Sequence, residues 1–138
     1  MKRILALRGR GNSGKTTTIT LLADMLKLNG WRQVPGKYKQ HGKDFIDMYK
    51  KDSILLGVTS SGDTFDLVNN MLQQMDDASC HIGICACRTY DFSSKPGTNA
   101  AVNGHSENVL FIEKTYAEGK NKQLEANTKD ASKVFNSL

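Results

Sequence analysis

The sequence predicts a single α/β domain over residues 1–138, built as a three-layer α/β/α sandwich around a mostly parallel sheet of about five strands. Three observations support this prediction. Short apolar runs alternate with segments in which apolar side chains recur every three or four positions, as in strands that alternate with amphipathic helices. The length suffices for one hydrophobic core and not for two. No apolar run approaches the roughly 18 residues of a membrane span.

The first segments predict a buried strand followed by a helix. Residues 4–7 form an apolar run that is better interpreted as a strand than as a secretory signal, which needs a longer apolar stretch. In residues 14–28 the apolar side chains fall at three- and four-residue steps, and Gly30 supplies a helix end. Residues 31–43 are interpreted as a loop.

The next apolar segments, residues 45–50 and 53–60, predict a hairpin around a short turn at Lys51-Asp52. The first strand of this hairpin is expected to run antiparallel at the edge of the sheet. Residues 54–58 are almost continuously apolar, so they are expected to form an interior parallel strand.

A second amphipathic helix is predicted over residues 64–75, with Asp63 or Thr64 as its N-cap. Residues 81–87 predict the next strand. A long polar connection follows, with one helical turn around Ala100, and four apolar residues then predict a last strand. The final helix is expected over residues 122–137 and is expected to bury Leu124, Ala131, Val134 and Phe135.

Residues 9–16 read Gly-Arg-Gly-Asn-Ser-Gly-Lys-Thr, a complete G-x-x-x-x-G-K-[ST] phosphate-binding motif between a predicted strand and a predicted helix. The glycines let backbone amides turn toward an anion, and the helix N-terminus adds partial positive charge. A glycine-rich turn that only caps a helix would not explain Lys15, because a lysine there opposes the helix dipole unless an anion is present. The candidate nucleotide-binding residues are Gly9, Arg10, Gly11, Asn12, Ser13, Gly14, Lys15, Thr16 and Thr17.

On these residues, the stretch from the first strand through the first helix resembles the P-loop containing nucleoside triphosphate hydrolase superfamily. The resemblance implies the P-loop NTPase fold, with a nucleoside triphosphate and Mg²⁺ as ligands. It also implies that Lys15 reaches the β- and γ-phosphate oxygens, that Thr16 ligates Mg²⁺, and that Thr17 lies near the α-phosphate. The sequence contains no guanine-specific N-K-x-D motif, which favours ATP over GTP.

Such a motif normally works with an acid at the end of a second strand, which holds Mg²⁺ through water. No apolar run of this chain leads cleanly into an aspartate. Asp63 is favoured, because Gly62 would let the chain turn sharply after the preceding strand, and capping the next helix is its alternative role. Glu113 follows four apolar residues but comes late in the chain. Asp47 lies in the predicted edge strand and is expected to be solvated.

Polar residues at the carboxyl ends of the predicted strands, where α/β sheets bind ligands, are expected to converge on the motif. They are Arg8, residues 60–63, Arg88 and Glu113. In P-loop kinases a lid in the region corresponding to residues 88–106 supplies arginines to the transferring phosphoryl group, which makes Arg88 a candidate. A surface arginine at a strand end is the alternative, and Lys95 has a weaker claim. The candidate catalytic residues are therefore Lys15, Asp63 and Arg88, and the candidate metal ligands are Thr16 and Asp63.

The net charge of +5 calls for an anionic partner, which the nucleotide supplies. Basic residues between Arg32 and Lys51, with Trp31 and Tyr38 nearby, leave nucleic acid as a weaker alternative to a solvated surface. No membrane partner is expected. The three cysteines fit a reducing cytoplasm, and buried hydrophobic side chains are favoured for them over zinc ligands, which would need a second Cys or His pair at suitable spacing.

Three functions are open at this point. ATP hydrolysis comes first, because 138 residues leave little chain for both an acceptor domain and a lid. A small-molecule or nucleotide kinase is the alternative, with residues 31–53 forming the acceptor site. A nucleotide-binding regulator without catalysis is the third, suggested by the missing standard acid.

Overall fold

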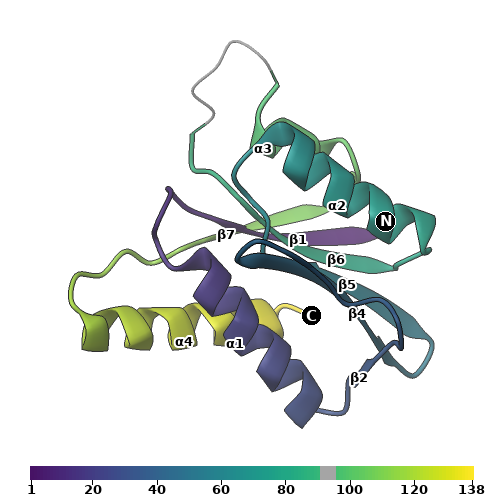
Figure 1. Cartoon of the computed structure of the whole chain (residues 1–138), viewed down its shortest axis with the longest axis horizontal. Coiled ribbons are helices and arrows are strands. Elements are labelled where there is room, and N and C mark those ends of the chain that lie inside the picture. Colours follow the sequence, from purple (N-terminus) through teal and green to yellow (C-terminus); the bar gives the residue numbers. More distant parts are fainter. Residues whose placement is uncertain (91–95) are drawn as a thin grey trace.

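A computed structural model describes residues 1–90 and 96–138, so Lys95 lies outside the described residues. Within these ranges the chain is an α/β protein with a mixed sheet of seven strands and four helices (Figure 1). The strands are β1 (Arg3–Arg8), β2 (Arg32–Gln33), β3 (Lys39–His41), β4 (Asp44–Lys51), β5 (Ile54–Thr59), β6 (Ile82–Cys87) and β7 (Val109–Glu113). The helices are α1 (Lys15–Leu28), α2 (Phe65–Asp77), α3 (Thr98–Asn103) and α4 (Lys120–Asn136).

The strands follow the order β2-β4-β5-β6-β1-β7, and β3 also pairs with β4. Strand β1 is parallel to β6 and β7, and β5 is parallel to β6. Strands β2, β3 and β5 all pair with β4 in the antiparallel sense. With three parallel and three antiparallel pairings among the described strands, the prediction of a mostly parallel sheet of about five strands was wrong.

The error comes from residues 31–43, which were expected to form a loop. They contain β2 and β3, whose side chains are all exposed and polar, so neither strand produces an apolar alternation. The hairpin of β4 and β5 is confirmed, but β4 is not an edge strand, because β2 and β3 cover its outer side.

Helices cover both faces of the sheet: α1 and α4 pack together on one face, and α2 and α3 pack together on the other (Figure 1). The interior strand β1 contributes side chains to both interfaces, because successive side chains of a strand point to opposite faces. Leu5 and Leu7 join the core beneath α1 and α4, whereas Ile4 and Ala6 join the core beneath α2. All four side chains are fully buried, which explains the uninterrupted apolar run of this strand.

The N-terminal ends of α2 and α4 test two predictions, the N-cap of the second helix and the burial of Leu124. Thr64 caps α2, with its side chain accepting a hydrogen bond from the Leu67 amide at 3.2 Å, so Asp63 is not needed as the cap. The predicted burial of Leu124 was wrong, because this side chain is 56% exposed. The first turns of α4 extend beyond the sheet in Figure 1, and burial begins further along the helix at Ala126 and Ala131.

The three cysteines are buried, as predicted. Burial raises the pKa of Cys80 to about 11 and the pKa of Cys85 well above its ordinary value, so both thiols stay protonated at neutral pH. Across residues 1–90 and 96–138, none of the helices has the length and apolar character that crossing a membrane requires.

Candidate functional site

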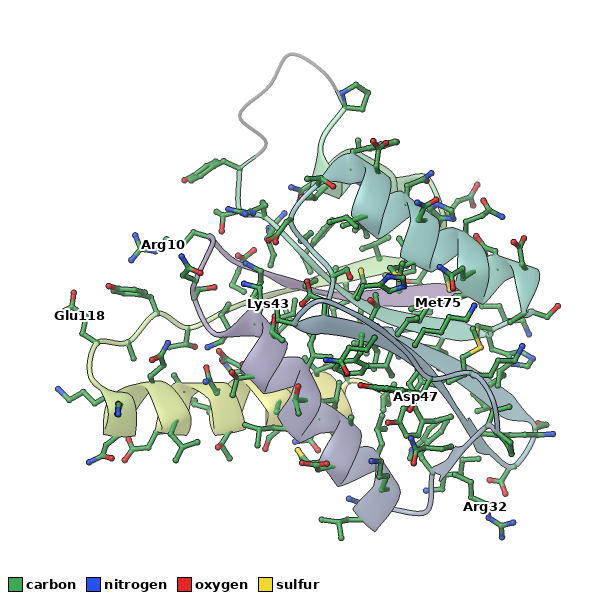
Figure 2. The ribbon with its side chains drawn as sticks, in the orientation of Figure 1. Arg10, Arg32, Lys43, Asp47, Met75 and Glu118 are labelled. Atoms are coloured by element: carbon green, nitrogen blue, oxygen red, sulfur yellow. The ribbon has the colours of Figure 1, made fainter. Side chains whose placement is uncertain are left out.

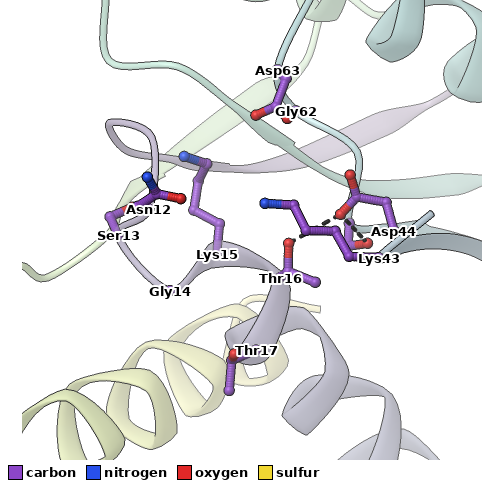
Figure 3. Close-up of a pocket in the computed structure, with 11 residues that line it drawn as sticks. Asn12, Ser13, Gly14, Lys15, Thr16, Thr17, Lys43, Asp44, Gly62 and Asp63 are labelled. Carbon is purple, nitrogen blue, oxygen red and sulfur yellow. Dashed lines mark hydrogen bonds between the residues drawn. The ribbon is translucent and has the colours of Figure 1, made fainter. Parts of the chain in front are cut away.

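The glycine-rich segment joins β1 to α1 and opens on a cavity at the start of that helix (Figure 3). Gly14 precedes α1 in the left-handed region, with φ of 92°, a conformation in which glycine avoids the strain of other residues. Among the described residues, no side chain caps α1, and its first turn holds no acid. The unpaired amides at this helix end therefore remain available to an anion.

Close contacts require all three glycines of the loop, and backbone conformation requires a glycine at Gly14 as well. A Cβ atom on Gly9 would lie 2.8 Å from the Lys114 Cβ, and one on Gly11 would lie 2.6 Å from an Arg88 guanidinium nitrogen. On Gly14 it would lie 2.5 Å from the Asn127 side-chain oxygen. The loop is thus held between β6 and α4 with no space for larger side chains.

Replacing Gly14 with alanine is expected to destabilise the fold by about 2 kcal/mol, because alanine is strained at positive φ and would also displace Asn127. Urea unfolding measures the effect. Gly104→Ala is the matched control, since Gly104 has φ of −74° and an added Cβ would meet its nearest atom at 3.4 Å. Equal stability of the two variants would contradict the assigned role of Gly14.

Lys15 is only 7% exposed, and its ammonium group folds back onto the loop. Its Nζ donates to the carbonyl oxygens of Gly9 and Arg10, each at 2.7 Å. Burial lowers the pKa of Lys15 below its ordinary value, and the positive charge of Arg88 lowers it further. The loop therefore presents a desolvated cation whose charged form a bound anion would stabilise.

Asp44 is a site residue that the sequence analysis missed. The Thr16 hydroxyl and the Ser60 hydroxyl each donate to the same Asp44 carboxylate oxygen at 3.0 Å (Figure 3). Asp44 is 9% exposed and lines the cavity in front of the loop. An acid was expected after a strand, but β4 runs antiparallel to β5, so the residue before the apolar part of β4 lies at the binding edge. The predicted antiparallel orientation of residues 45–50 could therefore have identified Asp44 as a site residue.

Asp63 and Arg88, two of the predicted catalytic residues, lie beside the loop and pair with each other. The Arg88 Nη2 is 3.1 Å from an Asp63 carboxylate oxygen, and both side chains are partly exposed. Among the described residues, the buried Nε of Arg88 has no hydrogen-bond partner. Asp63 lines the cavity in front of the loop, whereas Arg88 lines an adjoining one.

The remaining strand-end residues do not line this cavity. Arg8 donates from Nε to Glu113 at 2.7 Å, and its guanidinium lies 4.4 Å from the centre of the Phe111 ring. The expected convergence of Arg8 and Glu113 on the motif was therefore wrong, because the two side chains neutralise each other at the β7 edge. The expected solvation of Asp47 was also wrong: it is 1% exposed and accepts from Gln33 at 2.7 Å.

The predicted basic segment between Arg32 and Lys51 divides between the two ends of β4. Arg32 and Lys50 lie opposite each other in the pairing of β2 with β4, far from Asp44 at the other end of that strand. Trp31 is buried in the core, so its ring is not available to stack on a nucleobase. Lys43, in contrast, lines the cavity in front of the loop.

A buried ion pair anchors the segment after β7 against the loop. The Lys114 Nζ lies 3.0 Å from Asp130, and both side chains are fully buried. The Thr115 amide and hydroxyl donate to the same carboxylate at 2.7 and 2.9 Å. Burial alone would raise the pKa of Asp130, but the hydrogen bonds from Thr115 and Lys114 outweigh it and hold this pKa below its ordinary value.

The unfolding free energy is expected to decrease as the pH falls below about 4. A carboxylate whose pKa is lower in the folded state stabilises the protein above its unfolded pKa, and this contribution is lost as the pH falls through the folded pKa. Urea titrations from about pH 7 to about pH 3 measure it. Asp130→Asn should make the decline shallower, and the exposed Asp24→Asn should not. Equal slopes in both variants would contradict the role of Asp130.

Two adjoining cavities make up the site. The first has a volume of about 420 Å³, within the range of small-ligand sites, and is lined by Asn12, Ser13, Gly14, Lys15, Thr16, Thr17, Lys43, Asp44, Ser60, Gly62 and Asp63. The second, of about 370 Å³, is lined by Arg10, Gly11, Asn12, Lys43, Asp63, Arg88, Thr89 and Tyr90. Asn12, Lys43 and Asp63 border both, so ligands in the two cavities would be neighbours.

Comparison of the chain with protein-family models, with curated proteins and with solved structures finds no match.

Proposed function

We propose that the protein binds a magnesium complex of ATP in the first cavity and hydrolyses its β–γ phosphoanhydride bond. The observation that carries the proposal is the buried Lys15 ammonium, held by two neutral carbonyl groups at the uncapped N-terminus of α1. Both features favour an anion, and a triphosphate supplies charge and length for both. In this proposal the fold is a version of the P-loop NTPase fold, with the loop after the interior strand β1.

The residues facing Lys15 fit a magnesium ion. Mg²⁺ prefers oxygen ligands and retains several waters, and Thr16 and Asp44 offer a hydroxyl and a carboxylate 3.0 Å apart. The Ser13 hydroxyl also lines the cavity and, among the described residues, is buried without a hydrogen-bond partner. We assign Thr16 as the direct ligand and Asp44, in place of Asp63, as the acid that accepts from metal-bound water. When bound, the ion would neutralise charge on the phosphate oxygens.

The preference for ATP over GTP rests on the missing guanine-specific motif. An odd number of cysteines, three, fits a reducing compartment, so a cytoplasmic location is part of the proposal. Nucleic acid is the weaker alternative partner, since most of the basic segment lies away from the loop.

Phosphoryl transfer to a second small molecule is the second candidate function, and the adjoining cavity favours it. Asp63 and Lys43 border both cavities, so an acceptor would lie beside the terminal phosphate. Water would be the acceptor in hydrolysis, and a metabolite in a kinase reaction.

Calorimetric titration with Mg²⁺ and a non-hydrolysable ATP analogue tests the binding, and phosphate release from ATP tests the cleavage. Binding that is weakened by chelation of Mg²⁺, together with turnover, is expected. Absence of binding at millimolar nucleotide would overturn the proposal. Tight binding without turnover, unchanged in Asp63→Ala, would support a regulator in place of an enzyme.

A further inference from the structure

We propose that the second cavity is a phosphoryl-acceptor site and that its occupant is a small phosphate monoester. The inference rests on the proposed binding of ATP in the first cavity. It takes the second candidate function, phosphoryl transfer, in place of hydrolysis, with a second substrate that is itself an anion.

Among the described residues, the second cavity is rich in positive charge. Of the side chains in residues 1–90 and 96–138 that line it, Arg10, Lys43 and Arg88 are cationic and Asp63 carries the one carboxylate. Across residues 1–90 and 96–138, neither Arg10 nor Lys43 forms an ion pair. The surplus of two positive charges, three minus one, matches a phosphate monoester, which carries about −1.5 to −2 at neutral pH. A simple carboxylate supplies only half of this charge.

The donors of this cavity are held in place before any ligand arrives. The guanidinium of Arg88 packs against Gly11 and is fixed by its 3.1 Å contact with Asp63. The guanidinium of Arg10 lies 3.9 Å from the centre of the Tyr116 ring, which limits its freedom. Planar guanidinium groups bind phosphate oxygens in pairs, and fixed donors lose less entropy on binding.

The position of the cavity defines the reaction. A bond forms between the γ-phosphorus of ATP and an oxygen of the acceptor, and the bond from that phosphorus to the β,γ-bridging oxygen breaks. ADP leaves with the electron pair of the broken bond. The attacking oxygen is a hydroxyl of the phosphate monoester, and its proton passes to the carboxylate of Asp63, which borders both cavities.

Binding of inorganic phosphate to protein already saturated with Mg²⁺ and the non-hydrolysable ATP analogue tests the inference. Because the analogue occupies the first cavity, heat released by phosphate reports the second. Arg10→Gln removes a cation that lines only the second cavity and should weaken phosphate binding about tenfold. The control is Arg32→Gln, which makes the same change of charge at the opposite end of the molecule (Figure 2) and should leave this binding unchanged.

Each variant is measured at a concentration of the ATP analogue that saturates it, so a change in nucleotide affinity does not alter the measured phosphate affinity. Lys43→Gln gives a second variant, with weaker phosphate binding expected. If the analogue binds and phosphate does not, or if acetate binds as tightly as phosphate, the acceptor assignment is wrong and the proposed ATP site stands. Equal phosphate affinity in Arg10→Gln and Arg32→Gln would also overturn it. If the analogue itself does not bind, both proposals fail.

Discussion

Replacing Lys15 with alanine is expected to weaken the affinity for Mg·ATP by on the order of 100- to 1000-fold. In the proposed complex the ammonium contacts β- and γ-phosphate oxygens, and hydrogen bonds to charged groups contribute roughly 1.5–3 kcal/mol each. The loss of two such bonds, each at the lower end of this range, accounts for the predicted factor. No other cation can replace it from the same helix, because Lys27 lies in the last turn of α1.

The fold should tolerate this change. The lowered pKa of Lys15 shows that its charged form is disfavoured in the folded protein, chiefly by burial. The carbonyl groups of Gly9 and Arg10 lose a donor, but they lie at the open loop, where water can replace it. Thermal unfolding of Lys15→Ala should therefore remain cooperative and close to that of the unaltered protein.

Calorimetry and thermal unfolding of Lys15→Ala together separate binding from folding. Lys27→Ala is the matched control on the same helix, and its affinity for Mg·ATP should stay within about twofold of the original. Unchanged affinity in Lys15→Ala would refute the nucleotide assignment, whereas loss of the folded state would refute the expectation that the fold tolerates this change.

The sequence predicted those elements of the fold whose burial produces a recognisable arrangement of apolar residues along the chain. Strand β1 lies between two other strands and two helical layers, so its apolar run is uninterrupted, and α2 shows apolar side chains along one face only. Strands β2 and β3 are held by backbone pairing to β4 with every side chain exposed. Backbone hydrogen bonds are available to any sequence, so no side-chain pattern marks these strands.

The same distinction applies to the site. The phosphate-binding loop was predictable, because its glycines and Lys15 are adjacent in the chain and each has a local steric or electrostatic reason. Asp44 lies 28 residues along the chain from Thr16. The pairing of β4 with β5 brings its carboxylate to the Thr16 hydroxyl. The contact between Asp44 and Thr16 could be predicted only by placing the start of the antiparallel strand β4 at the same edge of the sheet as the loop.

The role of Asp44 leads to the second large effect: Asp44→Asn should lower the rate of ATP cleavage by on the order of 100-fold. Asparagine keeps an oxygen that can accept from Thr16 and Ser60, so the local hydrogen bonds and the fold should persist. What it lacks is the negative charge that attracts a magnesium ion and orients its waters. The affinity for ATP in the presence of a chelator should therefore stay unchanged, while the gain in affinity on adding Mg²⁺ should be largely lost.

Asp63→Asn is the decisive comparison. The carboxylates of Asp44 and Asp63 both line the first cavity, but in this proposal only Asp44 accepts hydrogen bonds from the water bound to the metal. Asp63 already pairs with Arg88, whereas Asp44 is bonded to the hydroxyl of Thr16. Titration of ATP cleavage with Mg²⁺ distinguishes the two. Asp63→Asn should keep the magnesium dependence of the unaltered protein, even where its maximal rate falls, and Asp44→Asn should not. The reverse result would return the metal to Asp63, and would mean that the bond between Asp44 and Thr16 serves only to join β4 to α1.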